Sequence, residues 1–270
     1  MRHYDTILFD LDGTLTESAP GIVNAVLYAL KKNGIEETDR EKLMTFVGPP
    51  LYDSFQKHYG MSKQQADHMV DDFREYYHER GWKENSPYEG VPEMLQTLRA
   101  QGRKLAVATS KPEVTAKQIL SFFGLTEYFD LIAGATMDDS RSRKGDVIAY
   151  AVAQLKAEAV GEPEQAEAVG KSEKVGKSEK AGAAGELKNS EKMSAGKIDD
   201  HILMVGDRSH DVAGAKENGL PCVGVLYGYG SREELEEAQA AAICAEVGDL
   251  PGVIDMLERK IAVQDSCDVK

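Results

Sequence analysis

Short apolar runs recur along the chain, and most of them lead through a turn into a segment with the apolar spacing of a helix. Runs that are apolar at almost every position are typical of parallel strands covered on both faces. Their alternation with helices predicts an α/β fold built on a doubly wound parallel sheet. The expected strands are residues 6–9, 104–108, 129–133, 201–205 and 222–226.

Residues 17–86 interrupt this alternation, because they have helical patterns and no strand pattern. One helix is expected to stop at Asn33-Gly34, a sequence that is common after the last helical turn. Another is expected to begin after Ser62, which together with Gln65 has the spacing of a capping box. The predicted domains are a core of residues 1–16 and 87–270 and an inserted α-helical cap of residues 17–86.

A different composition marks residues 157–197, which contain no aromatic residue and no Ile. They are rich in Ala, Gly, Glu, Lys and Ser, and the sequence Gly-Lys-Ser-Glu-Lys occurs at both 170–174 and 176–180. Such a segment has too little apolar surface to offset the entropy that is lost on ordering. We therefore expect a flexible low-complexity insertion within the core domain.

Composition and charge narrow the range of partners. The formal net charge is −14 and the isoelectric point is about 4.9, so long-range repulsion disfavours nucleic acid and anionic membranes. An anionic substrate would need local positive charge, for which a divalent cation is the obvious source. The three cysteines are widely spaced, and no apolar stretch approaches the roughly 20 residues of a membrane span. The expected location is the cytoplasm.

The first candidate site is the run Asp10-Leu11-Asp12-Gly13-Thr14, directly after the first expected strand. Two carboxylates one residue apart can divide two tasks, one facing a metal and a phosphorus atom and the other reaching the leaving-group oxygen. Asp-Gly also occurs in tight turns, so a plain turn is an alternative at this point. An EF-hand calcium loop is excluded, because no Glu occupies its twelfth position.

Three further candidates follow expected strands or begin helices. Thr109 and Ser110 follow the second expected strand and could bind an anion, although a helix cap is the alternative. Lys144 begins a helix, where a cation is unfavourable unless it faces a carboxylate or a phosphate, and an exposed basic turn is the alternative. Asp207 and Asp211 flank the turn after the fourth expected strand, a spacing that suits cation coordination or an N-cap.

Together, the four motifs resemble those of the haloacid dehalogenase (HAD) superfamily of phosphohydrolases: Asp-x-Asp-Gly-Thr, a Thr or Ser after a strand, a Lys, and Gly-Asp-x-x-x-Asp. The helical insertion after the first motif resembles the cap of the phosphoglycolate-phosphatase-like branch. The resemblance covers essentially the whole chain except residues 157–197. It implies a Rossmann-like core and the activity of a Mg²⁺-dependent phosphatase.

The resemblance also implies a role for each matching residue. Asp10 corresponds to the nucleophile that forms an aspartyl-phosphate, and Asp12 corresponds to the general acid and base. Thr109, Ser110 and Lys144 correspond to the groups that bind the transferring phosphoryl group.

Mg²⁺ is implied as the cofactor, bound by the Asp10 carboxylate, the main-chain carbonyl of Asp12, and Asp207. Asp211 corresponds to an acid just outside the metal coordination. The assignment is physically consistent, because an anionic carboxylate can approach an anionic phosphate only when Mg²⁺ and Lys144 reduce the repulsion.

The expected substrate is a small-molecule phosphomonoester of the phosphoglycolate type. A 5′-nucleotidase, a pyrophosphatase, a β-phosphoglucomutase-like mutase and a phosphoreceiver signalling domain without enzymatic activity stay open as alternatives. The mutase has a basic residue in its cap loop, whereas residues 46–51 have none, and a receiver is shorter and has no helical cap. The oligomeric state, monomer or dimer, is left open.

Overall fold

The computed structural model describes residues 3–138, 140–160 and 201–267. Within these residues, a six-stranded sheet has the strand order β5-β4-β1-β6-β7-β8, and every neighbouring pair is parallel. The predicted doubly wound α/β fold is therefore confirmed. The strands are Thr6–Phe9 (β1), Lys104–Pro112 (β4), Leu131–Ala135 (β5), Ile202–Gly206 (β6), Cys222–Val225 (β7) and Ala242–Cys244 (β8).

Strand β1 is the point at which the order of the sheet reverses. It pairs with β4 on one side, where Phe9 is opposite Val107, and with β6 on the other, where Phe9 is opposite Val205. The chain thus builds the sheet outward from β1 in both directions. Ligands of open α/β sheets bind beyond the carboxyl ends of the strands at such a switch point.

Side chains alternate between the two faces of the sheet, so each strand contributes to two hydrophobic clusters. In β1, Ile7 and Phe9 join one cluster and Leu8 joins the other. This cover on both sides explains why the strand sequences are almost continuously apolar. The first face is covered by α5 (Val91–Ala100), α6 (Glu113–Phe122) and α10 (Leu250–Cys267), and the second by α7 (Lys144–Val160), α8 (Ser209–Glu217) and α9 (Arg232–Glu237).

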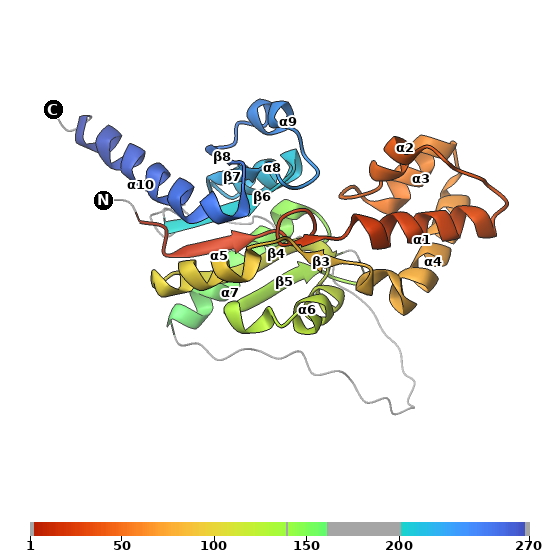
Figure 1. The fold of residues 1–270 in the computed structure, drawn as a ribbon, viewed down its shortest axis with the longest axis horizontal. Coiled ribbons are helices and arrows are strands. Elements are labelled where there is room, and N and C mark those ends of the chain that lie inside the picture. Colours follow the sequence, from red (N-terminus) through yellow and green to blue (C-terminus); the bar gives the residue numbers. More distant parts are fainter. Residues whose placement is uncertain (1–2, 139, 161–200, 268–270) are drawn as a thin grey trace, which may run out of the picture.

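The helices α1 to α4 form a separate group, here called the cap, at the end of the molecule opposite to α10 (Figure 1). The chain enters and leaves the cap through a two-stranded antiparallel ribbon, in which Thr16 is opposite Pro87. The treatment of residues 17–86 as a domain stays a prediction. The elements are β2 (Thr16–Glu17), α1 (Ala19–Lys32), α2 (Arg40–Met44), α3 (Leu51–Tyr59), α4 (Lys63–Glu79) and β3 (Ser86–Pro87).

Local sequence signals explain two of the cap helices. Helix α4 begins with a capping box, in which the Ser62 hydroxyl accepts from the Gln65 N–H and the Gln65 side chain accepts from the Ser62 N–H. Helix α1 ends at Lys32, and Gly34 follows with a φ of 73°, as the stop signal predicts. The buried side chains between the cap helices include Ile22, Val26, Leu30, Phe55, Met69 and Phe73.

Helix α7 continues through Val160, so residues 157–160 of the predicted insertion are helical. Ala and Glu are strong helix formers, and they extend the helix that begins at Lys144. The rest of the predicted insertion, 161–197, lies outside the described residues. Among the helices of the described ranges, none combines the length and the apolar character that crossing a membrane requires.

Candidate active site

A cleft opens at the carboxyl ends of β1, β4 and β6, between the sheet and the cap. Its volume is about 1070 Å³. The sheet side contributes mainly polar residues, whereas much of the cap side is apolar or aromatic. The polar residues of the sheet side include Asp10, Asp12, Thr109, Ser110, Lys111 and Lys144. The apolar and aromatic residues of the cap side include Ile22, Phe46, Leu51, Tyr52, Phe73 and Tyr77.

Asp10 occupies the first position after β1, and its N–H donates to the Val205 carbonyl of β6 at 2.9 Å. The side chain is buried, and its Oδ1 lies 2.7 Å from Nζ of Lys144, the first residue of α7. The structure thus brings together the residue predicted as nucleophile and the lysine predicted to bind phosphate.

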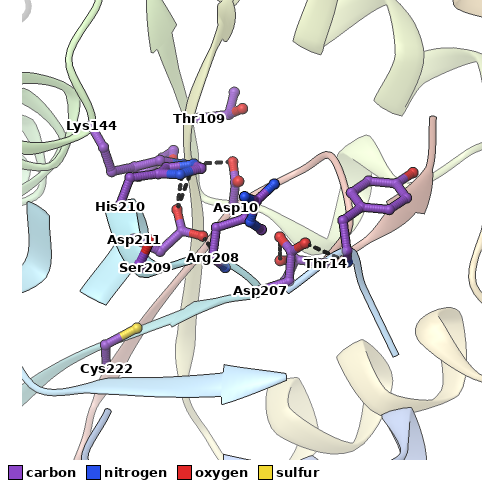
Figure 2. Close-up of polar contacts among 12 residues, drawn as sticks. Asp10, Thr14, Thr109, Lys144, Asp207, Arg208, Ser209, His210, Asp211 and Cys222 are labelled. Carbon is purple, nitrogen blue, oxygen red and sulfur yellow. Dashed lines mark hydrogen bonds and ion pairs between the residues drawn. The ribbon is translucent and has the colours of Figure 1, made fainter. Parts of the chain in front are cut away.

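Lys144 is held between two carboxylates, since its Nζ also lies 2.9 Å from Oδ1 of Asp211 (Figure 2). It donates a further hydrogen bond to the Ala108 carbonyl at 3.1 Å. Burial lowers the pKa of Lys144, but the charges of Asp10 and Asp211 outweigh burial and raise the pKa above its usual value. The lysine is therefore charged, and its two partners explain why a cation is stable at this helix N-terminus.

The two acids respond differently to this lysine. Burial raises the pKa of Asp10, and the charge of Lys144 only partly compensates. Burial also acts to raise the pKa of Asp211, but the charges of Lys144 and His210 outweigh it and hold the pKa below its usual value. Asp211 also accepts the N–H of Arg208 at 3.0 Å. It is thus a firmly ionised group whose contacts serve to hold Lys144 and its own loop.

Thr109 and Ser110 lie on β4, the strand next to β1, and both line the cleft. Figure 2 shows the Thr109 side chain near that of Asp10. Thr109 is buried, and its Oγ1 accepts the N–H of Lys111 at 3.2 Å. The hydroxyl can therefore still donate its hydrogen to an acceptor in the cleft.

A tight turn after β1 positions Asp12. Gly13 has a φ of 83°, and its N–H donates to the Thr16 carbonyl at 2.8 Å. A Cβ atom at Gly13 would lie 2.3 Å from Oδ2 of Asp207, so only glycine allows the turn to approach this carboxylate. Asp12 also forms an ion pair with Lys111 at 2.7 Å, a contact that no sequence motif above predicts.

Asp207 follows β6 and is completely buried. Its Oδ1 accepts from the Thr14 hydroxyl at 3.3 Å, and its Oδ2 accepts the Tyr229 N–H at 2.8 Å. Within the described ranges, no basic side chain forms an ion pair with it. Burial, and then the charges of Asp211 and Asp10, raise the pKa of Asp207 well above its usual value. A cation between Asp207 and Asp10 would relieve this repulsion.

The loop Tyr227-Gly228-Tyr229-Gly230 after β7 also belongs to the site, although no motif above includes it. A Cβ atom at Gly228 would lie 2.4 Å from Cβ of Asp207, so the loop backbone packs directly on this acid. The Tyr229 hydroxyl accepts the Ala19 N–H at 2.9 Å, which joins the loop to the first cap helix. Gly-x-Gly after a buried strand is the signal that could have revealed this close approach.

Arg208 connects the cap with the loop that contains Asp207 and Asp211. Its Nη1 donates to the Val47 carbonyl at 3.2 Å, and its Nε donates to Oε1 of Glu234 at 3.0 Å. The cap loop has no basic residue of its own, but this arginine of the core reaches it. The contact was not predictable from local sequence, because it depends on how the cap sits on the sheet.

One compact group of potential metal ligands occurs in the described part of the chain. Asp10, His210 and Asp211 each offer one ligand atom, and these atoms lie within 4.8 Å of one another. Asp211 is already paired with Lys144, and the His210 side chain is 38% exposed. Asp207, which the sequence predicts as a ligand, forms no ion pair with the basic side chains of the described residues, and the nearby charge of Arg208 only partly offsets the rise in its pKa. Charge balance therefore favours a cation between Asp10 and Asp207 over one at His210.

Comparison with known proteins identifies the family. A model described as haloacid dehalogenase-like hydrolase matches residues 7–172, which is more than half of the chain, and a second, HAD-hydrolase-like model matches residues 181–250. The chain belongs to the haloacid dehalogenase-like hydrolases, as the sequence motifs predict. The predicted class of enzyme, a phosphoric ester hydrolase, is also confirmed.

Three relatives illustrate the range of named activities. A 5′-nucleotidase of Pseudomonas aeruginosa is 36% identical over 93% of this chain and 96% of its own length. The tyrosine-protein kinase PtkA of Mycobacterium tuberculosis is 34% identical over 88% of this chain and 67% of its own length. The pyrophosphatase PpaX of Halalkalibacterium halodurans is 29% identical over 94% and 99%, respectively.

Among solved structures, a predicted phosphatase from Clostridium acetobutylicum is similar to this chain with a TM-score of 0.73 and 38% identity. The similarity covers 96% of this chain and 99% of the other. The relationship therefore extends over the cap as well as the sheet.

Proposed function

We propose that this chain is a Mg²⁺-dependent phosphatase that hydrolyses a small-molecule phosphomonoester through an aspartyl-phosphate on Asp10. First, a carboxylate oxygen of Asp10 bonds to phosphorus while the bond from phosphorus to the leaving-group oxygen breaks. Asp12 gives its proton to that oxygen, so the alcohol leaves as a neutral molecule. Asp12 then takes a proton from water, whose oxygen attacks phosphorus and releases inorganic phosphate and free Asp10.

The chain's own cation supports the nucleophile. Lys144 lies 2.7 Å from Asp10, so its charge is next to the position that the phosphoryl oxygens would occupy. Thr109 and Ser110 line the same wall of the cleft and could donate hydrogen bonds to these oxygens. Because its acidic partners keep Lys144 charged, it balances phosphate charge throughout the reaction.

Mg²⁺ would be bound by the carboxylates of Asp10 and Asp207 and by the main-chain carbonyl of Asp12. The site fits a divalent cation, because it has an excess of negative charge. Three buried acids, Asp10, Asp207 and Asp211, lie there with one buried lysine, Lys144. Oxygen ligands are also those that Mg²⁺ prefers. When bound, the ion supplies the positive charge that allows a carboxylate to approach a phosphate.

The observation that carries the proposal is the position of Asp10 at the switch point of the sheet. There it contacts a buried lysine from α7, while a threonine from β4 and a second acid two residues along the chain line the same cleft. A nucleophile, a balancing charge, an anion-binding hydroxyl and a proton donor are the groups that hydrolysis of a phosphomonoester requires.

A specific observation favours a second candidate function, that of a 5′-nucleotidase. Phe46, Tyr52 and Phe73 line the cap side of the cleft, whose volume is about 1070 Å³, and the ring of Tyr52 is partly exposed. Aromatic rings form stacked contacts with flat ring systems such as nucleobases. A relative of 36% identity is itself named 5′-nucleotidase, and phosphoglycolate needs far less space.

Release of inorganic phosphate tests both candidates. The panel contains phosphoglycolate, nucleoside 5′-monophosphates, sugar phosphates and pyrophosphate, each with Mg²⁺ and with EDTA. We expect Mg²⁺-dependent release from at least one phosphomonoester, and preference for nucleotides would establish the second candidate. No release, together with a stable phosphoaspartate, would contradict the proposal, as would interconversion of sugar phosphates without net release.

Asp10→Asn should lower turnover by at least about 10³-fold, because an amide cannot act as the nucleophile. The fold should persist, since the amide has the same shape and removes a buried charge. Circular dichroism and thermal unfolding check the fold beside the phosphate assay. Asp71→Asn, which changes an acid of α4 that is 73% exposed, is the matched control. Turnover of Asp10→Asn at the unmodified rate would refute the nucleophile.

A further inference from the structure

Lys111 is the partner of Asp12, the proposed general acid and base. Its Nζ donates to Oδ2 of Asp12 at 2.7 Å, and the two side chains are only 8% and 16% exposed. Oδ1 of Asp12 is buried and has no hydrogen-bond partner within the described ranges. Among those residues, Lys111 is therefore the group that fixes the orientation of this carboxylate.

Two separate elements hold Lys111 in place. Its main-chain N–H donates to Oγ1 of Thr109 at 3.2 Å within β4. Its Nζ lies 5.1 Å from the ring centroid of Tyr77 on the cap helix α4, a distance at which a cation is attracted to an aromatic ring. Tyr77 is itself buried. The ammonium group thus lies between the cap and the turn that contains Asp12.

We propose that Lys111 is a positioning residue, which holds the Asp12 carboxylate toward the leaving-group oxygen, and that Tyr77 makes this hold depend on the cap. The inference rests on the proposed function, in which Asp12 transfers the proton. Lys111 takes no part in bond making or proton transfer and acts only through the position of Asp12.

The burial of the pair gives the contact its importance. Exposed ion pairs constrain side chains weakly, whereas removing one partner of a buried pair leaves an uncompensated charge. Without Lys111, neither oxygen of Asp12 would have a partner among the described residues, and the carboxylate would turn toward water. A displacement of about 1 Å from the reactive geometry can cost on the order of 10²-fold in rate.

The competing role for Lys111 is direct contact with an anionic group of the substrate, since it lines the cleft. The two roles differ in their dependence on the leaving group. An alkoxide is strongly basic and needs the proton of Asp12, whereas a nitrophenolate is weakly basic and leaves without it. Misplacement of Asp12 would therefore slow the cleavage of alkyl esters selectively, whereas loss of a binding contact would affect alkyl and aryl esters alike.

The experiment compares kcat/KM for an alkyl ester, adenosine 5′-monophosphate or glycerol 3-phosphate, with kcat/KM for the aryl ester p-nitrophenyl phosphate. This parameter ends at cleavage of the phosphorus–oxygen bond, so the later hydrolysis, common to all substrates, does not contribute. Lys111→Met should lose about 10–100-fold with the alkyl ester and under about 3-fold with the aryl ester. Lys111→Gln still donates a neutral hydrogen bond and should lose less. Lys117→Met, which removes the same charge from an exposed pair with Glu113, should lose nothing.

Equal losses for the two esters, or no loss for either, would overturn the inference. Asp12→Asn is measured in parallel and should show the same selectivity, with a loss of about 10²–10⁴-fold for the alkyl ester. If the loss in Asp12→Asn does not depend on the leaving group, the proposed function fails. If the loss in Asp12→Asn depends on the leaving group but the losses in both Lys111 variants do not, only this inference fails. Tyr77→Leu should also lose more kcat/KM with the alkyl ester than with the aryl ester, but the difference should be smaller than in Lys111→Met. Should Lys111→Met not fold, as thermal unfolding would reveal, Lys111→Gln decides.

Discussion

Three acids and one lysine share the buried end of β1, and their charges do not balance. Lys144 pairs with Asp10 and Asp211, whereas Asp207 has hydrogen bonds alone among the described residues. The pKa values of Asp10 and Asp207 are raised, chiefly by burial, while that of Asp211 is lowered by Lys144 despite its burial. The site thus separates an acid that holds the lysine from two acids that would face a cation.

This separation predicts unequal effects of two substitutions on Mg²⁺ binding. Asp207→Ala removes a carboxylate ligand and should weaken Mg²⁺ affinity by at least about 10-fold. Asp12→Ala leaves the main-chain carbonyl in place and should change affinity by less than about 3-fold, although turnover falls. Titration calorimetry with Mg²⁺ measures both variants, with Asp71→Ala as an exposed control. Equal losses of affinity in the two variants would contradict the assignment of ligands.

At this scale, position in the sequence predicted much of the site. Asp10 and Asp207 follow β1 and β6, and Thr109 lies in β4 just past the stretch predicted as strand, so all three come near carboxyl ends that must meet at one edge of a parallel sheet. The direction in which a side chain points could not be predicted in the same way. Lys111 is only two residues beyond Thr109, yet its contact with Asp12 depends on packing against the cap, which local spacing does not encode.

The loop between β6 and α8 joins elements that are distant in the sequence. Arg208 donates to the Val47 carbonyl of the cap, and Glu234 of α9 accepts from both Arg208 and the Ser209 N–H. The same loop begins with Asp207, so the residue that contacts the cap is next in the chain to a proposed metal ligand.

If this contact holds the cap loop, Arg208→Met should loosen residues 46–50 without unfolding the protein. Hydrogen exchange of the Phe46, Val47 and Gly48 amides, the three that this segment has, should accelerate in the substrate-free protein by about 10-fold, which corresponds to about 1.4 kcal/mol of lost local stability. Arg232→Met removes an arginine from an exposed i,i+4 pair with Glu236 and is the control. Unchanged exchange in the cap loop would show that other contacts hold it.

The long strands and helices were predictable because burial on both faces imposes a clear pattern. Strands β1, β4 and β7 begin at the predicted residues, whereas β5 and β6 begin two and one residues later. Strand β8, Ala242–Cys244, has only three residues at the edge of the sheet, which is too short to give a pattern. The five-residue helix α2 and the nine-residue helix α3 escape prediction for the same reason.

For the molecule as a whole, the binding of an anionic substrate depends more on where the charges lie than on the net charge. The net charge is −14, yet Lys111, Arg143, Lys144 and Arg208 all line the cleft. Each of these cations is paired with an acid, so much of the positive charge that an anionic substrate needs would have to come from a bound divalent cation. Composition predicted the long-range repulsion of polyanions, but the fold was needed to show that these cations, together with Arg74 of α4, come from four separate segments and face one cavity.

If Mg²⁺ binds at the proposed site, the same uneven charge predicts that the stability of the protein depends on Mg²⁺ and on pH together. In the metal-free protein, the raised pKa values of Asp10 and Asp207 mean that these acids keep their protons to a higher pH than in the unfolded chain. Their contribution to stability is therefore present at low pH and is lost as the pH rises through the raised pKa values. Mg²⁺ requires the ionised carboxylates, so its stabilising effect should grow over that same range.

Thermal unfolding from pH 5 to pH 8, with Mg²⁺ and with EDTA, measures this linkage. At a hundredfold excess of Mg²⁺ over its Kd at high pH, the Tm should rise by about 5–10 °C, and the rise should shrink steadily as the pH falls. Asp207→Asn removes one of the titrating groups and a ligand, so it should lose most of the effect of Mg²⁺ at every pH. A rise in Tm that is the same at pH 5 and pH 8 would show that Mg²⁺ does not compete with protons for these acids, and would place the ion elsewhere.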